Sequence, residues 1–321
     1  MWSRRGILLA GGALVLTGCD AKVMKTISKV SDFASRMIEI TKRHGGKVGV
    51  SCTSGTASNH SGLNIESDQR FAHCSTFKWV LATAILSQVD AGKLKLSQAV
   101  RYGKADMLDY APVTKANLAK GQMSLADLCA AAVEQSDNTA ANLLLPLVGG
   151  PAGLTAFVRG LGDSVTRFDR NEPSLNSNVD GDERDTTTPS AMAGLLQTVF
   201  TGATLKPESL DKLKGWMIAC TTGNARIRAG VPAGYTVGDK TGTGENGAVN
   251  DVAVIWPPAG SKIDGPLFLA IYTSGGNLDA AGRDKVIADT TKLVFDTLDF
   301  AESLDSESEE ETSESPAASI S

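Results

Sequence analysis

Segments with strand character lie near both ends of this 321-residue chain, and a long helical block separates them. Residues 47–51 predict a strand that opens a hairpin toward Asn64, and three more strands are predicted near the other end, at 236–243, 250–256 and 266–273. A sheet with strands from both chain ends, and a helical domain inserted between them, satisfies this order most simply. We therefore predict an α/β molecule of the two-domain α+β type, in which helices flank an antiparallel sheet.

Helical periodicity sets the domain limits. Apolar residues recur at helical spacing over 27–42, over much of 75–223 and over about 283–298. We therefore divide the chain into a sheet domain formed by 24–67 and 220–299, and an inserted all-α domain formed by 68–219.

Charge is distributed unevenly along the chain. From Asp299 onward there are eight acidic residues and no Lys or Arg, so the net charge of −5 becomes +3 for the rest of the chain. This nearly neutral body shows no basic stripe and no basic amphipathic helix, which argues against nucleic-acid or membrane-surface binding. Residues 300–321 are rich in Ser and Glu, have too few apolar residues to form a core, and are predicted to be a disordered acidic tail.

The first nineteen residues have the composition of an export signal. Arg4 and Arg5 precede an apolar run, 7–16, that is too short to span a bilayer permanently. The run ends in Leu-Thr-Gly-Cys at 16–19, which resembles a bacterial lipobox, whose cysteine is lipidated and becomes the mature N-terminus. This resemblance implies export to the periplasmic side and anchoring to the membrane by a lipid on Cys19. The double arginine also resembles a twin-arginine signal, and a general secretory signal is the alternative.

A Ser-x-x-Lys motif, Ser75 to Lys78, stands at the start of the helical block. Residues three apart on a helix share a face, so the Lys78 amine is placed to take the proton of the Ser75 hydroxyl. A helix N-terminus also presents free N–H groups to developing negative charge. The motif alone is weak, because Ser209 and Lys212 have the same spacing where an exposed helix surface is expected.

Two tripeptides strengthen this interpretation, Ser-Asp-Asn at 136–138 and Lys-Thr-Gly at 240–242. Each tripeptide alone also fits a non-catalytic role, the first as a solvated turn and the second as an edge strand with an ordinary lysine. Together with Ser75 and Lys78, in this order, they form the signature of class A β-lactamases and penicillin-binding proteins. The chain therefore resembles these two groups of serine acyl-transfer enzymes.

Residues 170–185 favour the first group. An enzyme that aims one water at an ester needs a carboxylate base and an amide that shares the water, and Glu172 with Asn176 supplies both. The stretch resembles the omega loop of class A β-lactamases, in which Arg170 pairs with Asp185. The resemblance covers nearly the whole body of the chain and implies a class A serine β-lactamase with the serine β-lactamase/penicillin-binding-protein fold.

The resemblance also implies a mechanism and roles for individual residues. A penicillin or cephalosporin acylates the serine, and water then hydrolyses the ester, with Glu172 as the base for that second step. Whether Lys78 or Glu172 is the base for acylation stays open. The implied sets are Ser75, Lys78, Ser136 and Glu172 for catalysis, Asn138, Asn176, Lys240, Thr241 and Thr243 for substrate binding, and the N–H groups of Ser75 and Thr243 for the oxyanion hole.

Two further assignments have alternatives. The segment after Lys-Thr-Gly, 249–251, lacks the arginine that many class A enzymes direct at the substrate carboxylate. Arg226 resembles the arginine that a broad-spectrum subgroup supplies from the preceding segment, and its alternative is a surface charge that contributes little. Tyr110 resembles the aromatic gate of the cleft, and its alternative is a core aromatic residue.

Cysteine and histidine positions argue against a metal site or a cofactor. Cys52, Cys74, Cys129 and Cys220 and the three histidines form no metal-ligand spacing. Export permits disulfides, but the positions that pair with Cys74 and Cys129 in other members hold no cysteine here. We therefore expect buried free thiols that pack as small apolar residues.

Two other functions share part of this pattern. A penicillin-binding DD-peptidase has the three motifs but keeps its acyl-enzyme, and a β-lactam sensor lipoprotein acylates once without turnover. The loop that carries Glu172 and Asn176 argues against the DD-peptidase. A sensor would signal through a membrane-spanning segment, and the sequence predicts none. The expected partners are small β-lactam antibiotics, and the expected state is a monomer.

Overall fold

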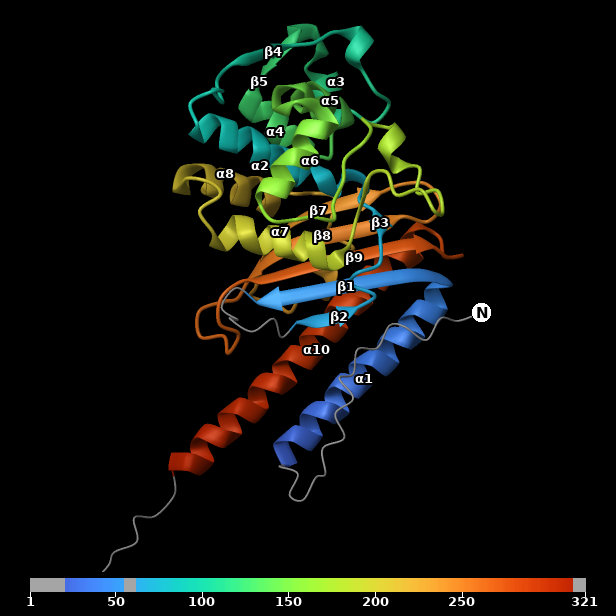
Figure 1. Cartoon of the computed structure of the whole chain (residues 1–321), viewed down its shortest axis with the longest axis vertical. Helices are drawn as coiled ribbons and strands as arrows, with labels where there is room; N and C mark the ends of the chain where they lie inside the picture. The colour runs from blue at the N-terminus through green and yellow to red at the C-terminus, as the bar shows by residue number, and fades with distance from the viewer. Residues whose placement is uncertain (1–20, 55–61, 314–321) are drawn as a thin grey trace, which may run out of the picture.

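The computed structural model describes residues 21–54 and 62–313, and a five-stranded antiparallel sheet crosses the middle of the molecule (Figure 1). The strand order is β2–β1–β9–β8–β7. The strands are β1 (Gly46–Ser54), β2 (Leu63–Ile65), β7 (Thr236–Thr243), β8 (Val249–Trp256) and β9 (Leu267–Gly275). Strand β1 pairs with β9 along its whole length, from Gly46 opposite Gly275 to Ser54 opposite Leu267. The prediction of one antiparallel sheet with strands from both chain ends is therefore confirmed.

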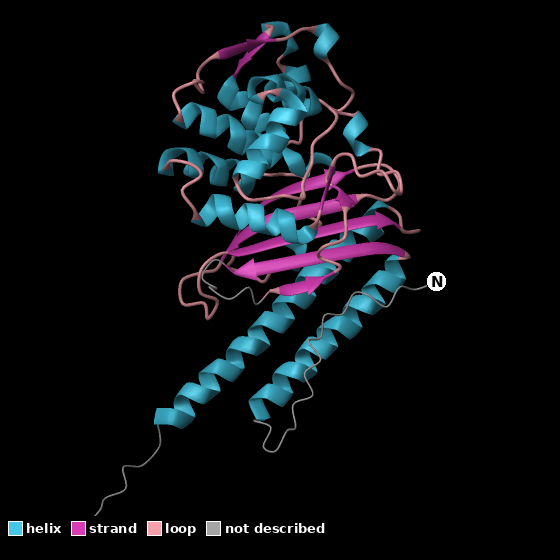
Figure 2. Ribbon diagram, in the orientation of Figure 1, coloured by secondary structure: helices cyan, strands magenta, loops and turns pink. Residues whose placement is uncertain are grey.

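Helices cover both faces of this sheet (Figure 2). On one face, α1 (Ala21–His44) and α10 (Ala280–Ser313) lie side by side, with the short α9 (Ile227–Gly230) against α10. On the other face, α7 (Pro189–Thr201) packs on β1 and β9, and α8 (Pro207–Ile218) packs on β7.

Strand β8 shows how two cores meet at the sheet. All its residues before Trp256 are buried, and successive side chains of a strand point to opposite faces. Val252 and Val254 join the core shared with the helical domain, whereas Ala253 and Ile255 join the core under α1 and α10. The sequence of a strand that is buried on both faces is a continuous apolar run and does not alternate between apolar and polar residues.

The inserted helical domain is built around α2 (Phe77–Asp90), whose residues from Phe77 to Leu86 are all buried. Around it lie α3 (Pro112–Ala116), α4 (Leu125–Glu134), α5 (Asn138–Leu144) and α6 (Gly150–Gly160). Two small ribbons complete the body, β4 (Ala99–Arg101) with β5 (Gln122–Ser124), and β3 (Phe71–Ala72) with β6 (Thr186–Thr187).

The C-terminal helix corrects one prediction. We placed the end of the helix near residue 298 and a disordered tail after it, but α10 continues to Ser313. Ala, Leu and Glu in this stretch have high helix propensity, and extending an existing helix requires no new nucleation. The first helix also begins earlier than residue 27, at Ala21. The predicted signal peptide, including Cys19, lies outside the described residues.

Within the described part of the chain, no single helix is long and apolar enough to cross a membrane, although the bent pair Asn138–Val148 and Gly150–Gly160 meets both conditions.

Candidate active site

Ser75 lies in a 3-10 turn, η1 (Cys74–Thr76), that leads directly into α2. Cys74 has a positive φ of 47°, a left-handed conformation that is uncommon outside glycine and frequent near active sites. The turn contacts β7 and β8 on one side and η5 (Ser174–Asn176) of the omega loop on the other. The serine is therefore placed where the sheet, the helical domain and the omega loop meet.

Lys78 is fully buried, and its Nζ donates to Ser75 Oγ at 2.9 Å. This contact confirms that the two residues share a helix face. The same Nζ lies 2.8 Å from Ser136 O, 2.5 Å from Asn138 Oδ1 and 2.9 Å from Glu172 Oε1. Burial lowers the pKa of Lys78, and the nearby Glu172 carboxylate opposes that shift. Burial thus brings the lysine closer to the neutral form that accepts a proton.

Ser136 connects Lys78 to Lys240. Its Oγ accepts from Lys240 Nζ at 3.0 Å and lies 3.4 Å from Lys78 Nζ. Ser136 has a positive φ of 56° and stands in the turn between α4 and α5. Burial lowers the pKa of Lys240 to about 8, and the positive charge of Lys78 adds to this effect. Ser136 Oγ therefore lies between the side-chain nitrogens of Lys78 and Lys240, and its expected role, passing a proton to the leaving ring nitrogen, stays a prediction.

The omega loop brings Glu172 to Ser75. Ser75 Oγ donates to Glu172 Oε1 at 3.2 Å, and Asn176 Nδ2 donates to Glu172 Oε2 at 2.6 Å. The predicted loop pair is also present, since Arg170 Nε donates to Asp185 Oδ2 at 2.5 Å. Asp185 is fully buried and closes the base of the loop. The base and the amide that we expected for aiming a water therefore lie side by side.

Arg226 is buried beneath the end of β7. Its Nη2 donates to Thr243 Oγ1 at 2.8 Å, and its Nε donates to Asp284 Oδ1 at 2.7 Å. Arg228 instead binds the buried Asp239 and the carbonyls of α8. The alternative that Arg226 is a surface charge is therefore wrong, and Arg226 is the arginine that reaches a predicted substrate-binding residue.

Tyr110 is 52 % exposed, so the alternative of a core aromatic residue is wrong. Its carbonyl accepts from Asn138 N at 3.0 Å, which places Tyr110 next to the Ser-Asp-Asn turn. Its role as a gate stays a prediction.

Several residues that hold the site in place were not assigned from the sequence. Asn142 on α5 bonds both backbone groups of Glu172. Asp137 is fully buried, caps α5 through Ala140 N and accepts from Thr114 on α3. Its place before a helix is an N-cap signal that was available in the sequence. Thr222 Oγ1 lies 2.6 Å from Thr241 Oγ1 and so orients that hydroxyl.

All four cysteines in the described residues are free and buried, as expected: Cys52, Cys74, Cys129 and Cys220. Burial raises the pKa of Cys74 to about 12, so the thiol beside the nucleophile stays protonated. No group of His, Cys, Asp and Glu within the described ranges has an arrangement that holds a metal ion.

Known proteins resemble this chain over most of its length. The model of the β-lactamase enzyme family matches residues 31–298. β-Lactamase CTX-M-8 of Citrobacter amalonaticus is 40 % identical over 286 residues, which cover 88 % of this chain and 96 % of that protein. A β-lactamase of Mycobacterium tuberculosis is 40 % identical over 312 residues, which cover 92 % and 98 %.

Solved structures agree with these relatives. The class A β-lactamase of the last common ancestor of Gram-negative bacteria superposes with a TM-score of 0.79 at 48 % identity, covering 83 % of this chain and 99 % of that one. A β-lactamase from Xanthomonas campestris gives a TM-score of 0.79 at 42 % identity, covering 84 % and 98 %.

The fold and the serine-centred site thus define a serine acyl-transfer hydrolase. The chain belongs to the β-lactamase enzyme family, and within it to the class A serine β-lactamases, which hydrolyse β-lactams and confer resistance to them.

Proposed function

We propose that this β-lactamase hydrolyses penicillins and cephalosporins through an acyl-enzyme on Ser75. One observation carries this proposal: Ser75 Oγ lies 2.9 Å from Lys78 Nζ and 3.2 Å from Glu172 Oε1. A serine hydroxyl becomes a nucleophile when a base takes its proton, and here two candidate bases are within hydrogen-bond distance.

In the acylation step, Ser75 Oγ attacks the β-lactam carbonyl and the amide C–N bond breaks. The serine proton passes to Lys78 or Glu172, and Ser136 delivers a proton to the ring nitrogen that leaves. The contact between Lys78 Nζ and Ser136 Oγ supports this route. The N–H groups of Ser75 and Thr243 stabilise the oxyanion, a role supported by the packing of β7 against the turn that holds the serine.

In the deacylation step, water attacks the ester and frees Ser75. Glu172 takes a proton from this water, and the Asn176 amide, which bonds Glu172 Oε2, helps to orient it. Glu172 then passes this proton to Ser75 Oγ as the ester C–O bond breaks, which restores both the serine hydroxyl and the Glu172 carboxylate. A DD-peptidase keeps the acyl-enzyme that it forms with a β-lactam, so the Glu172–Asn176 pair supports hydrolysis of that ester over its retention.

Substrate binding uses the charges and hydroxyls around β7. The Lys240 ammonium and the hydroxyls of Thr241 and Thr243 bind the substrate carboxylate, and Arg226 supports them through its bond to Thr243 Oγ1. Asn138 and Asn176 bind the amide side chain, and Tyr110 borders the cleft. All these residues belong to one chain, which supports function as a monomer.

Turnover tests this function directly. The purified protein is mixed with a large molar excess of nitrocefin, and hydrolysed molecules per protein are counted. Many turnovers per protein support the proposal. A single turnover followed by a stable adduct on Ser75 would assign the protein to the DD-peptidases or sensors instead.

We also propose that the chain is exported and held on the periplasmic side by a lipid on Cys19. The Leu-Thr-Gly-Cys sequence at 16–19 supports this, as does the apolar run before it.

A further inference from the structure

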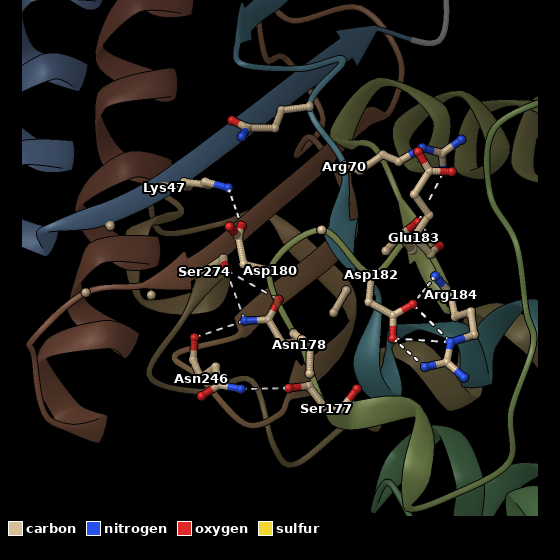
Figure 3. Close-up of a pocket in the computed structure, with 18 of the residues that line it drawn as sticks. Lys47, Arg70, Ser177, Asn178, Asp180, Asp182, Glu183, Arg184, Asn246 and Ser274 are labelled. Atoms are coloured by element: carbon tan, nitrogen blue, oxygen red, sulfur yellow. Dashed lines mark hydrogen bonds and ion pairs between the residues drawn. The ribbon is translucent and has the colours of Figure 1, made fainter. Parts of the chain in front are cut away.

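The second half of the omega loop is held by polar contacts rather than by a core. Residues 177–184 line a pocket of about 830 Å³ that lies between the loop and the adjoining ends of β1 and β9 (Figure 3). Val179, which lines this pocket, is 55 % exposed. Because the pocket separates the loop from β1 and β9, apolar side chains do not pack between them. The position of the loop therefore depends on hydrogen bonds.

Asn178 supplies several of the hydrogen bonds that join this part of the loop to neighbouring segments. Its Nδ2 donates to Asn246 O at 2.9 Å and to Ser274 Oγ at 3.0 Å, and lies 3.4 Å from Glu245 O. In Figure 3 the Asn178 amide points away from its own loop, toward Asn246 and Ser274. One side chain therefore connects the omega loop to the turn after β7 and to the end of β9.

Asn246 also bonds the omega loop. Its Nδ2 donates to Ser177 O at 2.9 Å, so each asparagine bonds the segment that carries the other. Both have positive φ, 43° for Asn178 and 48° for Asn246, a conformation that asparagine tolerates better than most residues. We call this reciprocal pair, with Ser274, the asparagine clamp.

The clamp lies two residues from Asn176. The turn that it binds also donates Glu245 N to Asn176 O at 2.8 Å. At the same place the backbones are in close contact, because a Cβ on Gly244 would lie 2.6 Å from Asn176 O. The clamp thus keeps Asn176 against the end of β7, and the Asn176 amide in turn holds Glu172 Oε2.

We propose that Asn178 is a positioning residue for deacylation, a role that rests on the proposed hydrolytic function. Asn178 is not among the residues to which we assign substrate binding or the water. It holds the omega loop so that Asn176 and Glu172 keep the geometry that aims the water at the Ser75 ester. When Lys78 takes the serine proton, acylation depends on Ser75, Lys78 and Ser136, which the clamp does not contact. By that route the clamp acts on the second step.

This role has a kinetic signature. When deacylation alone slows, acyl-enzyme accumulates, so kcat and KM fall by the same factor and kcat/KM is unchanged. Loss of folded protein lowers kcat and leaves KM unchanged. The two effects are therefore separable with one substrate.

The test variant is Asn178→Gly, which removes the amide but keeps a residue that adopts positive φ without strain. Ser274→Ala is the second variant, and it removes part of the clamp without changing the backbone. Asp180→Ala is the matched control, since Asp180 lies on the same loop and bonds only the exposed Lys47 among the described residues.

We expect kcat and KM for a penicillin to fall together by about five- to ten-fold in Asn178→Gly, and less in Ser274→Ala, with kcat/KM within about two-fold of wild type. Quenched samples should show a larger acylated fraction by intact mass. Asp180→Ala should match wild type. Unchanged kcat and KM in both clamp variants, or a fall in kcat/KM at constant KM, would overturn the inference. A wild-type protein that does not turn over would instead overturn the proposed function.

Discussion

Asn142 holds Glu172 by both of its backbone groups: Asn142 Nδ2 donates to Glu172 O at 2.9 Å, and Glu172 N donates to Asn142 Oδ1 at 3.0 Å. Asn142 lies on α5 of the helical domain, while Glu172 lies on the omega loop. One amide therefore connects the rigid domain to the proposed base. The backbone of Glu172 is fixed from one side by Asn142 and its carboxylate from the other by Asn176.

Replacing this amide should affect both stability and deacylation. Asn142→Ala removes two hydrogen bonds, each worth about 0.5–1.5 kcal/mol, so the free energy of unfolding should fall by about 1–3 kcal/mol. Deacylation should also slow, because Glu172 loses its fixed position. Urea unfolding and the decay of the Ser75 adduct measure the two effects. Asn117→Ala removes a comparable helical-domain bond and should affect stability alone. A wild-type deacylation rate in Asn142→Ala would show that Asn142 does not position the base.

Arg226 should contribute to substrate affinity through Thr243. Arg226→Ala should lower kcat/KM by about 10- to 150-fold, which corresponds to the roughly 1.5–3 kcal/mol of a charged hydrogen bond. Arg226→Lys should recover little, because an ammonium cannot bond Thr243 and Asp284 at once as the guanidinium does. Steady-state kinetics on folded protein, checked by circular dichroism, measures the loss.

Arg228 is the comparison for this variant. It pairs with the buried Asp239, so Arg228→Ala should lower the melting temperature by leaving that carboxylate without its cation. An unchanged kcat/KM in Arg226→Ala, or an equal fall in kcat/KM in Arg228→Ala, would show that the wrong arginine was chosen.

Lys240 should limit activity at alkaline pH. Its pKa is lowered to about 8, so the ammonium that binds the substrate carboxylate loses its charge as pH rises through 8. We expect kcat/KM for a penicillin to fall above about pH 8, and Lys240→Arg to abolish this fall because a guanidinium stays charged. A flat wild-type profile to well above that pH would contradict the assignment.

The titration of Lys240 does not itself favour unfolding in this pH range. An unfolded lysine keeps its proton to about pH 10.4, so between pH 8 and 10 the unfolded state binds more protons at this residue than the folded state does. The contribution of Lys240 to the free energy of unfolding therefore rises with pH in that window. Thermal melts across the same pH range separate this contribution from activity.

Cys19 should determine where the protein is found. If Cys19 is lipidated, the protein should partition with membranes, and Cys19→Ser should release it or block its maturation. Fractionation and N-terminal mass analysis measure both outcomes. A soluble wild-type protein whose mature N-terminus differs from Cys19 would refute the anchor.

The catalytic groups could be predicted from the sequence because short motifs carry them. The spacing of Ser75 and Lys78 requires a shared helix face, and the structure places Lys78 Nζ 2.9 Å from Ser75 Oγ. That strands from both chain ends share one sheet was also predictable, because strand patterns lie on either side of a long helical block and one sheet accommodates them most simply. The specific pairing of β1 with β9 came only from the structure.

The residues that support the site were harder to predict. Asn142 and Asn178 are ordinary polar residues in the sequence, and their partners lie 30 and 68 positions away, at Glu172 and Asn246. Nothing local marks such pairs, since tertiary structure creates them. The end of α10 differs from the prediction for another reason: the charged composition after residue 298 indicates disorder, but a packed helix can extend through such a stretch to Ser313.

The central claim is that Glu172 activates the deacylating water, and Glu172→Gln tests it most directly. Gln keeps the shape of the side chain but cannot accept a proton, and general-base assistance is worth about 10²–10⁴-fold. Mixed with a penicillin, Glu172→Gln should carry an intact-mass adduct of one whole substrate on Ser75, decaying slower by about that factor, while Ser75→Ala shows no adduct. Wild-type turnover by Glu172→Gln would contradict the mechanism.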